Sequence, residues 1–94
     1  MNIYILRKLE IMSICILLGT IINEVEFKFA IGGKHSSITR FKLRLENGTI
    51  LEARAYDRIA DRCYRKLQKD SIVIIQGRLN SKLEILVNDV FVIK

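Results

Sequence analysis

The chain has 94 residues, half of them hydrophobic, and it carries 16 Lys and Arg against 10 Asp and Glu, a formal net charge of +6. This length fits one domain with a small core, and the apolar content excludes an intrinsically disordered chain. The positive charge points to an anionic polymer or surface as the partner, but it does not separate DNA from RNA or anionic lipid.

We assign residues 1–11 to an N-terminal extension and residues 12–94 to the domain, with Met12 as an alternative start. The extension lacks the small-residue cleavage site of a signal peptide. The apolar run Ile14 to Leu18 is too short to span a membrane. We therefore expect no membrane partner.

Residues 13–31 are predicted to form one long strand. Its first part alternates two sets of residues, Ile14, Ile16 and Leu18 against Cys15, Leu17 and Gly19. Glycine inside a strand often marks a bulge or a bend, so Gly19 would let this strand contribute to both halves of a small barrel. The next segment, residues 32–37, has the composition of a loop. Its Gly-Gly-Lys does not complete a phosphate-binding motif.

Residues 38–56 show the clearest pattern in the chain. Two alternations follow each other, with Phe41, Leu43, Leu45, Leu51, Ala53 and Ala55 as the apolar members. Asn47-Gly48 between them predicts a hairpin, because both residues tolerate positive φ. A three-residue loop, residues 47–49, pairs Leu45 with Leu51 and keeps the inner face apolar, whereas a two-residue loop would mix apolar and charged residues on one face.

The outer face of this hairpin is predicted to collect Arg40, Lys42, Arg44, Arg54 and Tyr56. In the predicted register Lys42 lies opposite Arg54, a like-charge pair whose repulsion an acidic ligand would relieve. Cations on the wet side of a hairpin are often simply solvated, so both interpretations stay open on the pattern alone.

A helix is predicted after the hairpin. Asp57 is placed to cap it, and apolar residues follow at helical spacing as far as Leu67. Tyr64 on this helix is predicted to be a core or rim ring packed on the barrel.

Residues 71–79 and 83–93 predict two further strands, the second interrupted at Asn88-Asp89. On the first of these, Ile72 and Ile74 would point outward. Exposed aliphatic residues of this kind would be unusual in a monomer, so they indicate a covering layer or a subunit contact.

Cys15, Cys63 and the single histidine, His35, have no metal-ligand spacing. We interpret the cysteines as buried, reduced thiols and His35 as a surface loop residue. The sequence shows no paired carboxylates and no nucleophile with a base. We therefore expect no enzyme, no metal site and no cofactor.

The predicted order is strand, strand, strand, helix, strand, strand. Closing such an antiparallel sheet removes its edges, and the helix can plug one end. We predict an all-β fold with one helix, a five-stranded Greek-key barrel of the OB-fold type. The ligand face of that fold is commonly built around the second and third strands.

Three segments, in this order, resemble the bacterial single-stranded-DNA-binding (SSB) family. Residues 16–20 resemble its opening strand, and residues 55–61 the segment where an aromatic residue ends the third strand before the helix. Residues 73–79 resemble its V-x-I-x-G-x-L strand, so the matches cover most of residues 13–90. The chain is also similar to the plastid-encoded SSB-like proteins and to PriB, a short relative of SSB.

This resemblance implies non-catalytic, sequence-nonspecific binding of single-stranded DNA, with RNA as the other possible ligand. The residues expected to contact the ligand are Lys34, Arg40, Lys42, Arg44, Arg54, Tyr56 and Arg78, with Tyr56 stacking a base and the cations meeting phosphates. It further implies a homo-oligomer, a dimer or a tetramer, and a plastid location or otherwise a bacterial-type cytoplasm.

The chain departs from the family in two places. Ile50 stands where the family usually carries a tryptophan, and three residues follow Leu79 where the family has a long arm. Fewer stacking rings predict weaker and more salt-sensitive binding. The alternative is an oligomeric adaptor that kept the OB-fold and lost strong nucleic-acid binding.

Overall fold

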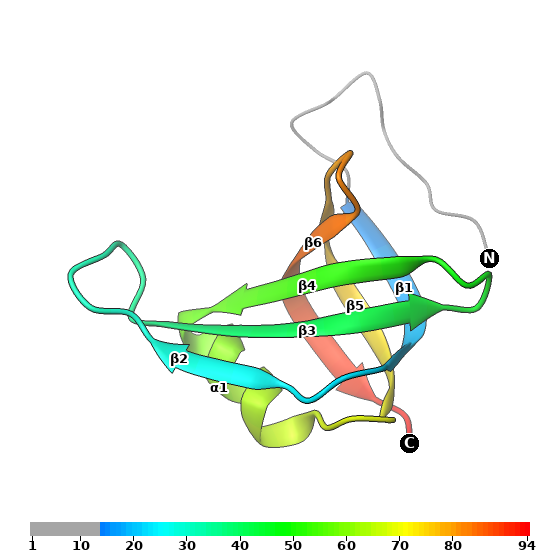
Figure 1. Ribbon diagram of the computed structural model, residues 1–94, viewed down its shortest axis with the longest axis horizontal. Coiled ribbons are helices and arrows are strands. Elements are labelled where there is room, and N and C mark those ends of the chain that lie inside the picture. Colours follow the sequence, from blue (N-terminus) through cyan, green and yellow to red (C-terminus); the bar gives the residue numbers. More distant parts are fainter. Residues whose placement is uncertain (1–13) are drawn as a thin grey trace.

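The computed structural model describes residues 14–94, and the predicted extension, residues 1–11, lies outside that range. The described strands are β1 (Ile14–Ile21), β2 (Glu26–Phe29), β3 (Ser37–Leu45), β4 (Ile50–Tyr56), β5 (Ile72–Leu79) and β6 (Glu84–Val92). A helix, α1 (Asp57–Lys66), lies between β4 and β5 (Figure 1). Within residues 14–94 no helix is long and apolar enough to cross a membrane.

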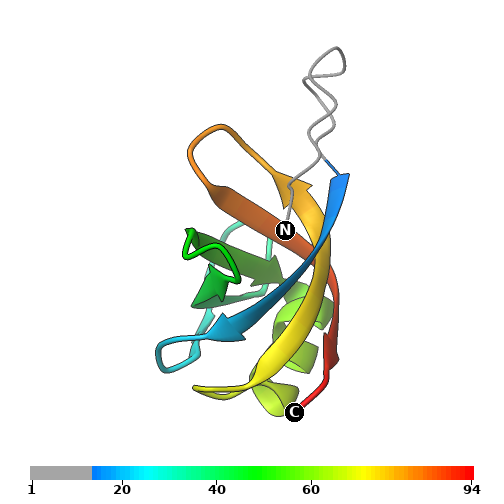
Figure 2. The ribbon, with the colours of Figure 1, turned by 90° about the vertical axis from the view of Figure 1, so that its right-hand side faces the viewer.

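Five of these strands close into a barrel. The hydrogen-bonded order is β1-β5-β6-β4-β3, and β3 pairs back onto β1. β4 and β6 run parallel, while the other pairs are antiparallel. β2 adds to the free edge of β3, and α1 lies at one end of the barrel (Figure 2). The predicted OB-fold barrel with one helix is confirmed.

The core is formed by the inward members of each alternation. The largest fully buried side chains are those of Phe41, Leu17, Ile21, Leu43, Leu51, Ile75, Ile85, Val73 and Val90. Each of the five barrel strands therefore turns one face to the core and the other outward, as the period of two predicts.

β1 contributes to two walls of the barrel, and Gly19 lies where the second pairing begins. It pairs with β5 from Ile14 to Thr20 and with β3 from Gly19 to Ile21. A Cβ atom on Gly19 would lie 2.8 Å from the carbonyl oxygen of Arg44, so any larger residue would push the strands apart. The prediction that this strand contributes to both halves of the barrel is confirmed.

The prediction of one continuous strand over residues 13–31 is wrong. The chain leaves the sheet between Ile21 and Glu26. In that gap the side-chain Oδ1 of Asn23 accepts a hydrogen bond from the backbone N–H of Lys42 at 2.8 Å. The Asn23 side chain thus supplies the acceptor that a continuing strand would have supplied. The chain therefore leaves β3 after Ile21 without leaving the Lys42 N–H unpaired.

The predicted register of the β3–β4 hairpin is wrong by two residues, although its faces are right. Leu43, not Leu45, lies opposite Leu51. The loop has three residues as predicted, but it closes at Leu45 and Thr49, whose N–H and C=O bond at 2.8 Å. This placement puts Gly48 at φ +91°, the one position in the turn where glycine is needed.

The prediction that Asp57 caps α1 is also wrong. Tyr56 occupies the N-cap position, and no side chain makes the cap hydrogen bond. The helix is instead attached through Thr39, whose buried hydroxyl donates to the carbonyl oxygen of Ala60 at 2.8 Å. Tyr64 is a rim residue, 51% exposed, with its ring 5.0 Å from that of Phe27.

The interruption predicted at Asn88-Asp89 is a bulge. Gln76 pairs with Asp89, but the next residue, Gly77, pairs with Val87, so Asn88 is an extra residue in β6. A Cβ on Gly77 would collide with the backbone carbonyl oxygen of Leu86. Glycine is therefore required where the bulge brings β6 against β5.

Candidate nucleic-acid interface

The outward side chains of β3 and β4 form the surface that we call the hairpin face. Its members are Ile38, Arg40, Lys42, Arg44, Ile50, Glu52, Arg54 and Tyr56. Their neighbours along each strand are buried, so the alternation fixes the direction of every one of these side chains. Five of the seven residues predicted to contact a ligand therefore lie together on one wall of the barrel.

The shift in register changes the charge pairs on the hairpin face. Lys42 lies opposite Glu52, with Nζ 3.8 Å from Oε2, so the predicted Lys42–Arg54 pair is wrong. The like-charge pair is Arg40 opposite Arg54. Repulsion between directly opposed guanidinium groups favours an anion lying between them.

Carboxylates from neighbouring strands lower the positive potential of this face. Glu84 of β6 places Oε1 3.5 Å from Nη2 of Arg54, and Glu26 of β2 lies opposite Arg40. Asn80 donates a hydrogen bond to Glu84 at 2.8 Å, and this bond, with the charge of Arg54, holds the pKa of Glu84 below its ordinary value. Glu84 is thus ionised at neutral pH, and Arg54 has a fixed counter-ion.

Arg78 joins the hairpin face through β6. It is exposed and pairs with Leu86, which in turn pairs with Arg54. The outward residues Arg78, Leu86, Arg54 and Arg40 therefore form one row across β5, β6, β4 and β3, which we call the arginine row. Neighbouring strands are about 4.8 Å apart, so the row spans roughly 14 Å of the barrel wall.

Lys34 lies off the sheet, in the exposed loop of residues 30–36 between β2 and β3. Figure 1 shows this loop extending past the end of the hairpin where β4 ends and α1 begins. The neighbouring His35 lies against Tyr56, so Lys34 belongs to the Tyr56 end of the hairpin face rather than to the arginine row.

His35 is the residue at this site that sequence reasoning missed. Its ring stacks on that of Tyr56, with centroids 4.2 Å apart and planes 23° apart. Its Nδ1 donates to Oδ2 of Asp57 at 2.8 Å, which with the Ser36 N–H holds the pKa of Asp57 down at about 2. The partner acid is 22 residues away in sequence, so no local pattern could have indicated it.

The hairpin tip carries an aliphatic residue on its outer face. Ile50 is 47% exposed and lies opposite Arg44. Other exposed aromatic rings lie elsewhere: Phe29 meets Phe27 edge to face at 5.1 Å, on the side of β2 that faces α1. Tyr56 and His35 are therefore the aromatic rings that border the hairpin face among residues 14–94.

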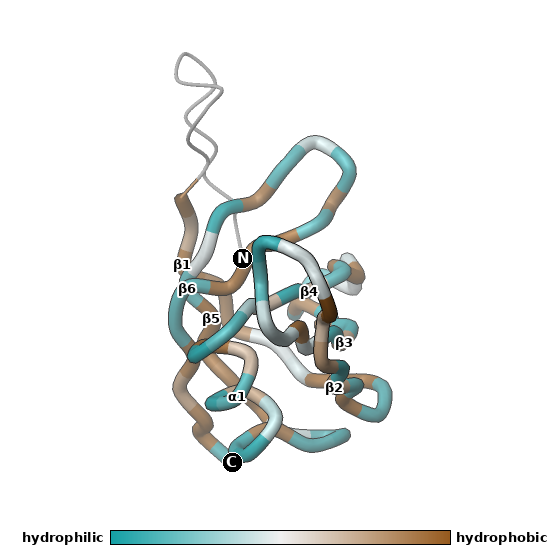
Figure 3. Tube along the Cα trace, turned by 90° about the vertical axis from the view of Figure 1, so that its left-hand side faces the viewer, coloured by the Kyte–Doolittle hydropathy of each residue, from teal (hydrophilic) through white to brown (hydrophobic). Residues whose placement is uncertain are grey.

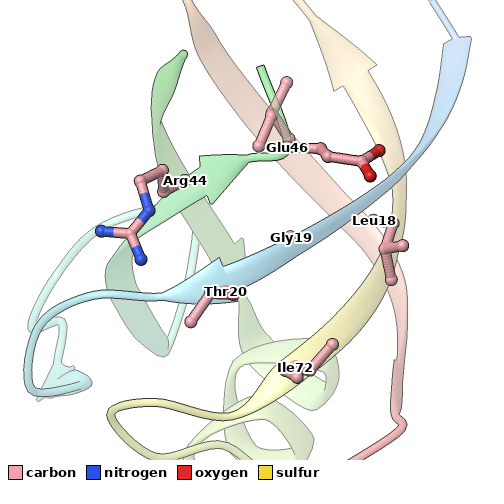
Figure 4. Close-up of a pocket in the computed structure, with 7 residues that line it drawn as sticks. Leu18, Gly19, Thr20, Arg44, Glu46 and Ile72 are labelled. Carbon is pink, nitrogen blue, oxygen red and sulfur yellow. The ribbon is translucent and has the colours of Figure 1, made fainter. Parts of the chain in front are cut away.

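A small open pocket lies where β1 passes beneath the hairpin tip (Figure 4). It has a volume of about 240 Å³ and is lined by Leu18, Gly19, Thr20, Arg44, Leu45, Glu46 and Ile72. Figure 4 shows the Arg44 and Glu46 side chains pointing to opposite sides of it. The Arg44 side of the pocket continues into the hairpin face.

The described residues contain no group of three or more His, Cys, Asp or Glu side chains placed to hold a metal ion. Cys15 and Cys63 are free and buried, as predicted. Burial raises the pKa of both thiols, that of Cys63 to about 12, so neither is a thiolate at neutral pH.

Known proteins resemble this chain in structure rather than in sequence. No protein-family model and no characterised protein sequence matches it significantly. The SSB domain of a Synechococcus protein superimposes with a TM-score of 0.72 at 20% identity, covering 82% of this chain and 91% of that one. The small single-stranded DNA-binding protein of Streptomyces coelicolor gives 0.74 at 15% identity, covering 85% and 91%.

The single-stranded DNA-binding protein of Thermus aquaticus gives a TM-score of 0.72 at 19% identity, covering 86% of this chain and 40% of that longer one. Each of these matches covers more than four fifths of this chain. The chain therefore has the OB-fold in the form found in single-stranded DNA-binding proteins.

Proposed function

We propose that this protein binds single-stranded DNA without sequence preference and without catalysing a reaction. The observation that carries the proposal is the arginine row, which runs across four strands. The next outward residue of β4 after Arg54 is Tyr56, which stacks with His35 at the end of the hairpin face. Guanidinium groups bind phosphates regardless of sequence, and any base presents a π-face for stacking. The names of the structural neighbours support the same ligand.

Binding should be moderate and strongly salt-dependent. The hairpin face pairs two of its cations with Glu52 and Glu84, and its tip carries Ile50 in place of a ring. Stacking contributes about 1–3 kcal/mol per base, so a site with few rings depends more on its cations. Each phosphate contact on a single strand adds about 0.7 to the slope of log K against log salt.

The decisive experiment is a salt titration of binding to labelled oligo-dT and oligo-rU. Replacing Arg40 and Arg54 with Gln should weaken binding and lower the slope by up to about 1.4. Arg65→Gln is the matched control, because Arg65 is exposed on α1 and already pairs with Asp61 at 2.7 Å. A wild-type affinity that is flat between ~50 and 200 mM salt would exclude this function. Comparing the two oligomers decides between DNA and RNA.

We also propose that the protein is a homo-oligomer, joined through the outer face of β1, β5 and β6. In this face Leu18, Ile74 and Phe91 lie side by side on adjacent strands, and Ile16 is 65% exposed. Figure 3 shows apolar residues in brown along β1 and β5. Such a contiguous apolar surface is typical of an interface.

A second copy of the chain is the partner that fits this surface. Within residues 14–94, β1 has hydrogen-bonded neighbours on both sides only from Gly19 to Thr20, so its Ile14–Leu18 edge is open to another strand. Light scattering should show a dimer or tetramer, and Ile16→Glu should shift it to a monomer. A monomeric wild-type protein at micromolar concentration would refute the proposal.

A second candidate function is an OB-fold adaptor with weak nucleic-acid binding, and a plastid location would suit either role. The carboxylates beside Lys42 and Arg54 favour the adaptor, because they lower the attraction for phosphate. The PriB-like resemblance is compatible with both. Tyr56→Ala distinguishes them: an unchanged oligonucleotide affinity supports the adaptor, and a fall in affinity supports a binding site on the hairpin face.

A further inference from the structure

The loop of residues 30–36 is fastened to the start of α1. Its two ends meet, with the Ala30 N–H bonded to the Ser36 carbonyl at 2.9 Å. Asp57 then holds it from the other side: its Oδ1 accepts from the Ser36 N–H at 2.7 Å and from the Ser36 hydroxyl at 3.0 Å. Its Oδ2 accepts from His35 Nδ1 at 2.8 Å. One carboxylate therefore satisfies three donors of the loop.

Asp57 makes these bonds from an unfavourable backbone conformation. Its φ is +56°, in the left-handed region that residues with a Cβ seldom adopt. The side chain that could have capped α1 points to the loop instead, and the helix begins without a side-chain cap. A strained residue persists only when its surroundings hold it, and here the three loop donors do so.

The result of this attachment is that the His35 ring covers the Tyr56 ring. The two rings are 4.2 Å apart and nearly parallel, so one face of Tyr56 is unavailable to a base. Both residues are partly exposed, and 38% of the His35 side chain is open to solvent. The aromatic surface presented to solvent at this end of the hairpin face therefore belongs to His35 as well as to Tyr56.

We infer that His35 and Tyr56 form a two-ring platform and that His35 stacks the nucleic-acid base. This inference rests on the proposed binding of single-stranded nucleic acid and adds the residue that receives a base. With Tyr56 behind it and Asp57 holding its Nδ1, the imidazole keeps one orientation. A preorganised ring loses little conformational entropy when a base stacks on it.

The opposite role, a cover that must leave Tyr56 before a base binds, requires the loop to break its bonds to Asp57. In that case removing the His35 ring would uncover Tyr56 and tighten binding. The two roles thus predict opposite changes in binding affinity when the His35 ring is removed. The inference can therefore be tested without a structure of the complex.

The experiment measures the Kd for labelled oligo-dT at fixed low salt. His35→Gln removes the ring but keeps a polar side chain next to Asp57, and it should weaken binding by about 5- to 150-fold, the equivalent of losing one stacked base. His35→Phe keeps a ring without the Asp57 bond and should bind within a few-fold of wild type. Both variants should leave the salt slope unchanged if the histidine acts by stacking.

Tyr64→Gln is the control for loss of an exposed ring. Tyr64 is 51% exposed and packs on Phe27, away from the hairpin face, so its variant should bind as wild type does. Wild-type affinity in His35→Gln, tighter binding in it, or equal loss in His35→Phe and His35→Gln each overturn the inference while the proposed function stands. Absence of salt-dependent binding by the wild-type protein overturns both.

Discussion

Glu52 on the hairpin face and Glu84 beside it should restrain ligand binding, and removing their charge should strengthen it. The double variant Glu52→Gln, Glu84→Gln keeps the shape of both side chains and releases Lys42 and Arg54, which they contact at 3.8 and 3.5 Å. Ion pairs that are largely solvated contribute at most about 1 kcal/mol to folding. The variant should therefore fold and melt nearly as the wild type does.

The size of the gain follows from Coulomb's law. A carboxylate about 7 Å from a bound phosphate repels it by about 0.6 kcal/mol in water. That corresponds to roughly threefold in Kd for one carboxylate and roughly tenfold for the pair at low salt. If each released cation then meets a phosphate, the slope of log K against log salt steepens by up to about 1.4.

Fluorescence anisotropy with oligo-dT over a range of salt concentrations measures both quantities. Asp61→Asn is the control, because Asp61 pairs with Arg65 on α1 at 2.7 Å, outside the hairpin face. It also removes one negative charge, so it reports the effect of net charge alone. If the control gains as much affinity per charge, or if the double variant gains none, the hairpin face is not where the phosphates bind.

Two other predictions concern the barrel and the loop that hold the site. Gly77→Ala should destabilise the protein by at least about 1–3 kcal/mol, because its Cβ would meet the Leu86 carbonyl. Thermal unfolding measures this loss, and Gly33→Ala, which has space around it, should have little effect. The hydrogen bond from the Ser36 N–H to Asp57 should be stable above the ordinary aspartate pKa of 3.8 and be lost as the pH falls toward the Asp57 pKa of about 2. The NMR chemical shift of the Ser36 amide proton, measured against pH, reports this loss. Asp57→Asn should abolish that pH dependence.

The barrel was predictable from the sequence because apolar and polar residues alternate along its strands. A one-sided core requires apolar residues at every second position, and β1, β3, β4 and β5 all keep that pattern. Two special positions were also visible in the sequence. The close approach of β1 to β3 needs a glycine at position 19, and a bulge suits the polar pair Asn88-Asp89. These features depend on neighbours in the sequence or on strict alternation.

The aromatic platform could not be predicted because its parts come from separate elements. His35 lies in a loop, and its contacts with Tyr56 and Asp57 depend on how that loop folds back. The backbone of Asp57 adopts a positive φ that its residue type does not favour. The sequence indicated an N-cap for this residue, and tertiary contacts overrode the local preference.

For the β3–β4 hairpin, the residues of the outer face were predicted correctly, but their cross-strand charge pairs were not. A shift of two residues keeps every side chain on its side of the sheet, so Arg40, Lys42, Arg44, Arg54 and Tyr56 stay together. The same shift exchanges each cross-strand partner, and it turns the expected repulsion at Lys42 into an ion pair with Glu52.

The charge of such a face depends on strands that are distant in sequence. Glu84 reaches Arg54 only because β6 runs parallel beside β4, a pairing that no hairpin pattern encodes. An incoming phosphate must compete with this carboxylate, and the competition costs at most about 1 kcal/mol for an exposed pair. Under the proposed function, the affinity of the arginine row for a strand is therefore set by the salt concentration and by these carboxylates.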